Sequence, residues 1–125
     1  MLQTVLLISL GAIIGANLRY FVALGITRLI PSSFPFGTLV INITASFILG
    51  FFVIWTSERV LADPRWRIFI AIGFCATYST YSSYIFETFA LIEKGQFSFA
   101  ALNLLVTNVV CFVAVVLGAA LARKL

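Results

Sequence analysis

The sequence has little of what most enzymes and soluble proteins depend on. Its 125 residues include no histidine and only four acidic side chains, and charged residues make up 10% of the chain. Soluble domains carry about a quarter charged residues. The absence of histidine removes most metal-ligand and general-base schemes. Cys75 and Cys111 both lie in apolar stretches, which predicts buried thiols rather than a disulfide. The composition therefore argues against a soluble enzyme.

Long apolar runs are what the sequence has in abundance, since 62% of its residues are hydrophobic. A bilayer core about 30 Å thick needs roughly 20 consecutive apolar residues per helix. Four stretches meet that need, at residues 4–29, 36–57, 64–91 and 97–122. The N-terminus lacks the basic region of a cleavable signal. We expect an all-α integral membrane protein with four transmembrane helices, forming one domain over residues 1–125.

Basic residues flank the two ends of these spans unequally. The end that carries both termini has Arg59, Arg65, Arg67, Arg123 and Lys124, and the opposite end has Arg28 and Lys94. The positive-inside rule then favours cytoplasmic termini, but the bias is small enough to permit insertion in both directions. The net charge of +4 comes mainly from these flanks, so it does not suggest nucleic acid as a partner.

Polar residues within the second and fourth spans recur at four-residue spacing, which places them on one helix face. They are Thr38, Asn42 and Ser46, followed by Gly50, and Asn103, Thr107 and Cys111, followed by Gly118. Such residues can be structural, because Ser and Thr bond back to their own helix and Asn can join helices. The alternative is a shared polar route through the bundle, and the sequence leaves both open.

The third span is the most polar, with glycine, hydroxyls and phenols crowded into residues 73–84. Together with Arg19, the polar residues of the spans are mostly hydrogen-bond donors, and Glu87 is the one acid that could lie in the membrane. A proton pump or cation pore normally has an acid there. A donor-lined route favours a small anion.

Three local signals concern packing and helix ends. Gly11 and Gly15 form a small-xxx-small pair, which permits close approach of another helix. Asp63 followed by Pro64 predicts an N-cap and a helix start, and Gly95 predicts a helix end.

The segment GFCATYSTYS at 73–82 resembles the G-x-x-G-x-T-T-F-S-T-F-S signature of the Fluc/CrcB family of small fluoride channels. GAIIGANLRY at 11–20 is similar to its G-G-x-x-G-A-x-x-R-Y motif, and FGTLVINI at 36–43, with the polar and glycine positions that follow, to its F-P-x-G-T-L-x-x-N-x-x-G-x-F segment. The likeness covers nearly the whole chain in order.

The resemblance implies an antiparallel, dual-topology homodimer in the bacterial inner membrane, with two pores. Each pore would let cytoplasmic fluoride leave passively, giving fluoride resistance. It also implies a third helix broken mid-membrane at residues 73–77. A structural sodium ion at the dimer interface would be held there by the backbone carbonyls of Gly73 and Ala76, with Thr77 as a further candidate. The implied partners are fluoride, a second copy of the chain and the lipid bilayer.

The resemblance also assigns the anion pathway. The family's two pore phenylalanines correspond to Tyr78 and Tyr81. The other implied residues are Asn42, Thr38, Ser82, Asn103, Thr107, Cys111 and Arg19, the last near the vestibule. Tyrosine at both phenylalanine positions is a departure from the family pattern. Another is Tyr84, where the family often has glutamate and where Glu87 is the nearest acid.

Two other functions fit a small four-helix membrane protein. A drug/proton antiporter would need a glutamate in the first span, which residues 4–29 lack. A purely structural assembly subunit would use the polar stripes for packing alone.

Overall fold

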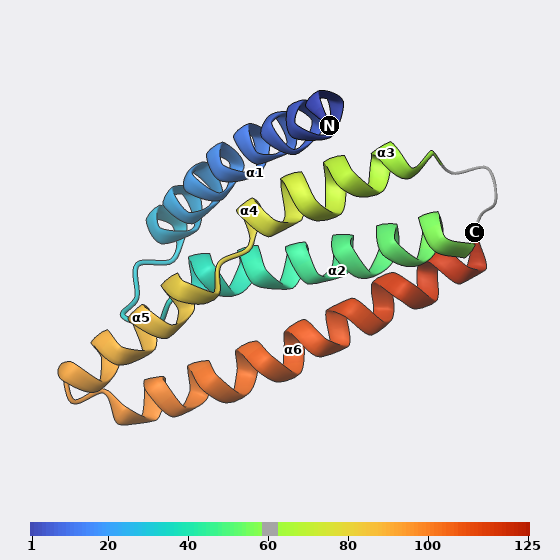
Figure 1. Ribbon diagram of the computed structural model, residues 1–125. Helices are drawn as coiled ribbons and strands as arrows, with labels where there is room; N and C mark the ends of the chain where they lie inside the picture. The colour runs from blue at the N-terminus through green and yellow to red at the C-terminus, as the bar shows by residue number, and fades with distance from the viewer. Residues whose placement is uncertain (59–62) are drawn as a thin grey trace.

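Helices form every element in the described part of the chain, residues 1–58 and 63–125 of a computed structural model (Figure 1). The first two spans are α1 (Leu2–Leu29) and α2 (Phe36–Glu58). The third contains α3 (Pro64–Arg67), the π-helix η1 (Ile68–Cys75), α4 (Ala76–Tyr78) and α5 (Tyr81–Glu93), and the fourth is α6 (Phe97–Lys124). All four are long and apolar enough to cross a membrane, which confirms the expected spans. Arg59, expected to flank a span, lies outside the described residues.

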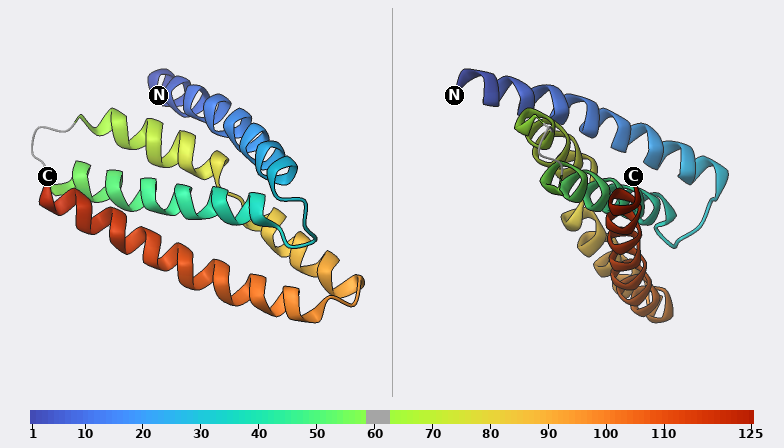
Figure 2. Two further views of the ribbon diagram at one scale, coloured as in Figure 1. Left: turned by 180° about the vertical axis from the view of Figure 1, so that it is seen from behind. Right: turned by 90° about the vertical axis from the view of Figure 1, so that its right-hand side faces the viewer.

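The two halves of the third span pack on different neighbours. η1 and α4 pack against α1, α5 packs against α6, and α2 packs along α6 (Figures 1 and 2). Both termini lie at the end of the bundle where α3 begins, and the α1–α2 and α5–α6 connections lie at the opposite end. The expected four passes across a membrane follow from this arrangement.

Glycines set how closely the helices approach. A Cβ on Gly11 or Gly15 would collide with the backbone of η1, at 2.5 Å from the carbonyl oxygens of Phe69 and Phe74 respectively. The small-xxx-small pair therefore allows the close helix approach that its spacing predicted, and the helix that it meets is the third span. Gly50 and Gly118 do the same between α2 and α6, where an added Cβ would lie 2.3 Å and 2.2 Å from facing carbonyl oxygens.

The predicted start and end of the third span are confirmed. Asp63 accepts a hydrogen bond from the Arg65 backbone N–H at 2.9 Å, with Pro64 at the first helical position. Gly95 has φ of 72°, a left-handed conformation that favours glycine and stops α5.

The break in the third span is real, but its predicted position at residues 73–77 was wrong. Those residues are helical, and the backbone becomes extended at Ser79 and Thr80. The hydroxyl of Thr77 donates to the Gly73 carbonyl oxygen at 2.7 Å, within the helix. The Thr80 N–H instead donates to the side chain of Asn42 at 2.9 Å. A side chain on another helix therefore takes the amide proton that would have continued α4.

The outer surface of the bundle is apolar. Only Gly11 and Gly15 are buried in α1, and large side chains such as Phe21, Leu105 and Phe112 are more than 60% exposed. Soluble monomers rarely expose apolar surface on this scale, and such surface marks contact with lipid or with another protein. The chain is a multi-pass membrane protein.

Candidate functional site

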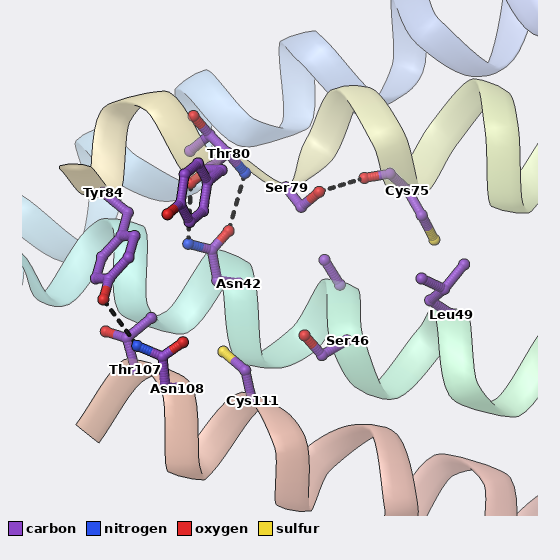
Figure 3. Close-up of a pocket in the computed structure, with 12 residues that line it drawn as sticks. Asn42, Ser46, Leu49, Cys75, Ser79, Thr80, Tyr84, Thr107, Asn108 and Cys111 are labelled. Carbon is purple, nitrogen blue, oxygen red and sulfur yellow. Dashed lines mark hydrogen bonds between the residues drawn. The ribbon is translucent and has the colours of Figure 1, made fainter. Parts of the chain in front are cut away.

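A polar pocket lies beside the break in the third span. Its volume is about 240 Å³, and it is bounded by α2, α6, the Ser79–Thr80 segment and the start of α5 (Figure 3). Its lining includes Asn42, Ser46, Ser79, Thr80, Tyr81, Tyr84, Thr107, Asn108 and both cysteines. None of the described lining residues is charged. Four residues of the predicted pathway meet here: Asn42, Tyr81, Thr107 and Cys111.

The side-chain amide of Asn42 forms two hydrogen bonds with the backbone of Thr80, at the break. Its Nδ2 donates to the Thr80 carbonyl oxygen at 3.1 Å, and its Oδ1 accepts from the Thr80 N–H at 2.9 Å. Thr80 is 8% exposed, so its backbone groups would have few other partners without this side chain. The predicted pore asparagine therefore fixes the backbone at the pocket wall.

A second set of amide and hydroxyl groups joins α5 to α6. Asn108 donates through Nδ2 to the Tyr84 hydroxyl at 2.9 Å. Asn103, which is 1% exposed, donates to the Thr88 hydroxyl at 2.9 Å and accepts from the Thr107 hydroxyl at 3.1 Å. Asn103 and Thr107 of the predicted α6 stripe are thus hydrogen-bonded to each other. Thr107 and Cys111 reach the pocket, whereas Asn103 lies in the interior beyond it.

The two predicted pore tyrosines occupy different environments. Tyr78 is 4% exposed, stacks on Phe74 and shares a hydrogen bond with the Thr44 hydroxyl at 3.0 Å. Tyr81 is 74% exposed and lines the pocket beside Tyr84, with ring centroids 5.7 Å apart. Because the break lies between them, Tyr78 belongs to the core of the bundle and Tyr81 faces outward.

A second pocket, which we call the outer pocket, opens near the α1–α2 connection. It has a volume of about 230 Å³. Its lining consists of Ala23, Thr27, Ile30, residues 32–38 and Glu87. The Thr38 hydroxyl donates to Glu87 Oε1 at 2.7 Å, while Glu87 Oε2 is buried without a hydrogen-bond partner among the described residues. Thr38 lies one turn before Asn42 on α2, and Glu87 lies about one turn after Tyr84 on α5. The outer pocket and the polar pocket are therefore successive along the same two helices.

The remaining predicted residues lie apart from both pockets. Arg19 is half-buried on α1, and Ser82 is exposed on the first turn of α5. Gly73 is buried against α1, and Ala76 is exposed in the last turn before the break. The described residues hold no group of three or more histidine, cysteine or acidic side chains suited to a metal.

Several functional contacts were not assigned from the sequence. Ser79, Thr80 and Asn108 line the polar pocket, and Glu87 joins Thr38. The hydroxyl-rich segment at 73–84 signalled the first two, but the partners are 38 or more residues away in sequence for Thr80 and Glu87. Only the folded arrangement brings them together.

Comparison with known proteins gives consistent matches over most of the chain. The family model described as "CrcB-like protein, Camphor Resistance (CrcB)" matches residues 6–119. A protein named fluoride-specific ion channel FluC from Koribacter versatilis (strain Ellin345) is 47% identical over 118 residues, covering 94% of each chain. Proteins of the same name are each 38% identical in Sulfurihydrogenibium sp. (strain YO3AOP1), over 99% of this chain and 100% of that one, and in Pyrococcus abyssi (strain GE5 / Orsay), over 98% of both.

Proposed function

The chain belongs to the CrcB family, and we propose that it is a fluoride-selective channel of the bacterial membrane. Two relatives named fluoride-specific ion channel match this chain over nearly their whole length. The channel lets cytoplasmic fluoride leave the cell passively and so gives fluoride resistance. It is not an enzyme, and no chemical step is required of its residues.

One observation carries this proposal: the polar pocket is rich in donors and has no charged residue among its described lining. Fluoride is a small anion that accepts hydrogen bonds from amide and hydroxyl groups. Asn42 uses one Nδ2 proton on Thr80 and keeps a second, and the hydroxyls of Ser46 and Tyr81 also line the pocket. The site is partly shielded from water, and hydrogen bonds there are stronger than in bulk solvent. A cation would find no carboxylate there, which favours an anion as the permeating species.

The route runs along α2 and α5, from the outer pocket past Thr38 and Glu87 to the polar pocket beside Asn42 and Tyr84. Thr38 and Asn42 lie one helical turn apart on α2, as Glu87 and Tyr84 do on α5, so the Asn42 amide is the next donor along the route after the Thr38 hydroxyl. The exposed ring of Tyr81 stands at the open side of the polar pocket. Its ring edge carries partial positive charge and suits an anion.

In this proposal the working channel is a dimer of two copies of the chain. The wide apolar surface, the 74% exposure of Tyr81 beside the polar pocket and the small bias in flanking charge all support an antiparallel homodimer with two pores. In that assembly Tyr81 and Ser82, exposed in one chain, would lie between the protomers.

A structural sodium ion is the remaining part of the proposal. Ala76 fits it, since its carbonyl belongs to the last turn before the break, where helix carbonyls lack intrahelical partners. Ala76 is also exposed, so the same residue of a partner chain can bind the same sodium ion. Gly73 fits less well, because its carbonyl already accepts from Thr77. The ion would supply a fixed positive charge between two chains, and backbone oxygens suit such a hard cation.

The antiporter alternative is not supported. α1 contains no acidic residue, and the family relatives are named as channels. Purified protein in liposomes distinguishes the two functions. We expect fluoride efflux to proceed with the proton gradient clamped at zero. Efflux that occurs only with an opposing proton gradient would overturn the channel assignment.

A further inference from the structure

The Thr38–Glu87 pair places a carboxylate at the start of a helix. Thr38 is the third residue of α2, and Phe36, Gly37 and Thr38 all line the outer pocket together with Glu87. The first N–H groups of a helix have no intrahelical partner and carry partial positive charge. The Glu87 carboxylate therefore lies where the fold offers both a helix N-terminus and a hydroxyl donor to an anion.

We infer that the outer pocket is an anion-binding site, and that the Glu87 carboxylate occupies it as a tethered anion competing with the permeating anion for Thr38. This inference rests on the proposed function and adds a site and a positioning residue to it. The single hydroxyl proton of Thr38 is donated to Glu87 Oε1 at 2.7 Å. A hydroxyl has one proton to donate, so Thr38 cannot donate to fluoride until the carboxylate releases it.

The carboxylate is held incompletely, which makes it displaceable. Its Oε2 is buried and has no hydrogen-bond partner among the described residues. Neither of the described ion pairs includes Glu87, because they join Arg65 to Asp63 and Arg123 to Glu58. A buried carboxylate with one unpaired oxygen gains by turning toward water or another donor. The proposal therefore requires a second state, in which Glu87 has turned away from Thr38, beside the bonded state that the structure contains.

The test measures fluoride flux in liposomes for Glu87→Gln, Thr38→Val and the double variant. Glutamine keeps the shape but loses the charge, and charge-assisted hydrogen bonds are about twice as strong as neutral ones. We expect Glu87→Gln to raise flux at limiting fluoride about tenfold, which corresponds to roughly 1.4 kcal/mol of lost competition. Flux at saturating fluoride should change much less. With Thr38→Val, the same change at Glu87 should raise flux by less than about twofold, since the contested donor is gone.

Glu93→Gln is the matched control, because Glu93 is an exposed acid at the end of the same helix and lines neither pocket. We expect it to leave flux unchanged. Glu87→Ala serves as a second variant if the glutamine form does not elute as a folded species, with the same direction expected.

Three results would overturn the inference. One is unchanged or reduced flux in folded Glu87 variants, and another is an equal increase with and without the Thr38 hydroxyl, which would indicate a long-range charge effect alone. The third is an equal increase in Glu93→Gln. Failure of the wild-type protein to pass fluoride would instead contradict the proposed function, so the two failures are distinguishable.

Discussion

Replacing Asn42 separates a structural role from a role in permeation. Asn42→Ala removes both hydrogen bonds to Thr80, at 3.1 Å and 2.9 Å, and leaves a buried N–H and C=O unpaired. Each such group costs about 1–3 kcal/mol, so for the two groups we expect a loss of roughly 2–6 kcal/mol in the free energy of unfolding. Asn42→Asp keeps an acceptor for the Thr80 N–H but loses the donor and adds a negative charge.

The assay compares thermal unfolding in detergent with fluoride flux in liposomes. We expect Asn42→Asp to be the more stable of the two variants and to lose at least as much flux, because a carboxylate repels an anion at the pocket wall. Flux in both variants should fall by more than about tenfold, while the fraction of assembled protein falls less. Asn17→Ala is the control. The Asn17 side chain is exposed, and among the described residues its hydrogen bond goes to its own helix, to the Ile13 carbonyl oxygen at 2.7 Å. The free energy of unfolding of this variant should therefore change by less than about 0.5 kcal/mol.

Two results would refute this reasoning. If flux and assembly fall in equal proportion in both variants, Asn42 acts only as interhelical glue. If Asn42→Asp conducts fluoride as well as the wild type, the Asn42 wall of the polar pocket does not face the anion.

Three further predictions follow from packing, thiol position and capping. Gly118→Ala places a Cβ 2.2 Å from a carbonyl oxygen of α2 and should lower the free energy of unfolding by about 1–3 kcal/mol. Gly25→Ala is the control, because an added Cβ there has nothing within 4 Å, and it should be neutral or stabilise by up to about 1 kcal/mol. Equal losses of the two variants in thermal unfolding would contradict the close α2–α6 contact. Both cysteines line the polar pocket, but Cys75 is only 2% exposed, so a negatively charged methanethiosulfonate reagent should inhibit flux by labelling Cys111. Cys111→Ser should be insensitive, and inhibition that persists in this variant but is lost in Cys75→Ser would place the reactive thiol at Cys75 and contradict the prediction. Asp63→Ala removes the cap to the third span and should cost about 1 kcal/mol in thermal unfolding, whereas no loss would show that the cap is dispensable.

The four spans could be predicted from the sequence because their signal is local. Each is a run of apolar residues whose length matches a bilayer, and the ends carry their own chemistry in Asp63, Pro64 and Gly95. The glycine spacing of α1 likewise predicted close packing, since Gly11 and Gly15 must share a face in any α-helix. Which helix they would contact was not readable from that spacing.

The position of the break was not predictable from local sequence. The resemblance implied a break at residues 73–77, but the Thr77 hydroxyl bonds back to the Gly73 carbonyl oxygen and the helix continues. The chain opens instead at Thr80, because Asn42 on another helix binds both its backbone groups. The position of the break is therefore set by a contact between residues 38 positions apart in the sequence.

The orientation of the tyrosines depends on that break. Tyr78 and Tyr81 are three residues apart and would share a face in a continuous helix. The extended backbone at residues 79 and 80 separates them, so that one is 4% and the other 74% exposed. Glu87 illustrates the same point, since its pairing with Thr38 spans 49 positions.

The most direct measurement of the central claim is the initial rate of fluoride efflux beside that of chloride from liposomes holding the wild-type protein. A donor-lined, uncharged pocket that serves as a fluoride pore predicts rapid fluoride efflux and chloride efflux no faster than from protein-free liposomes. Chloride passing as readily as fluoride would contradict selectivity at this pocket, and absence of fluoride efflux from folded protein would contradict the channel itself.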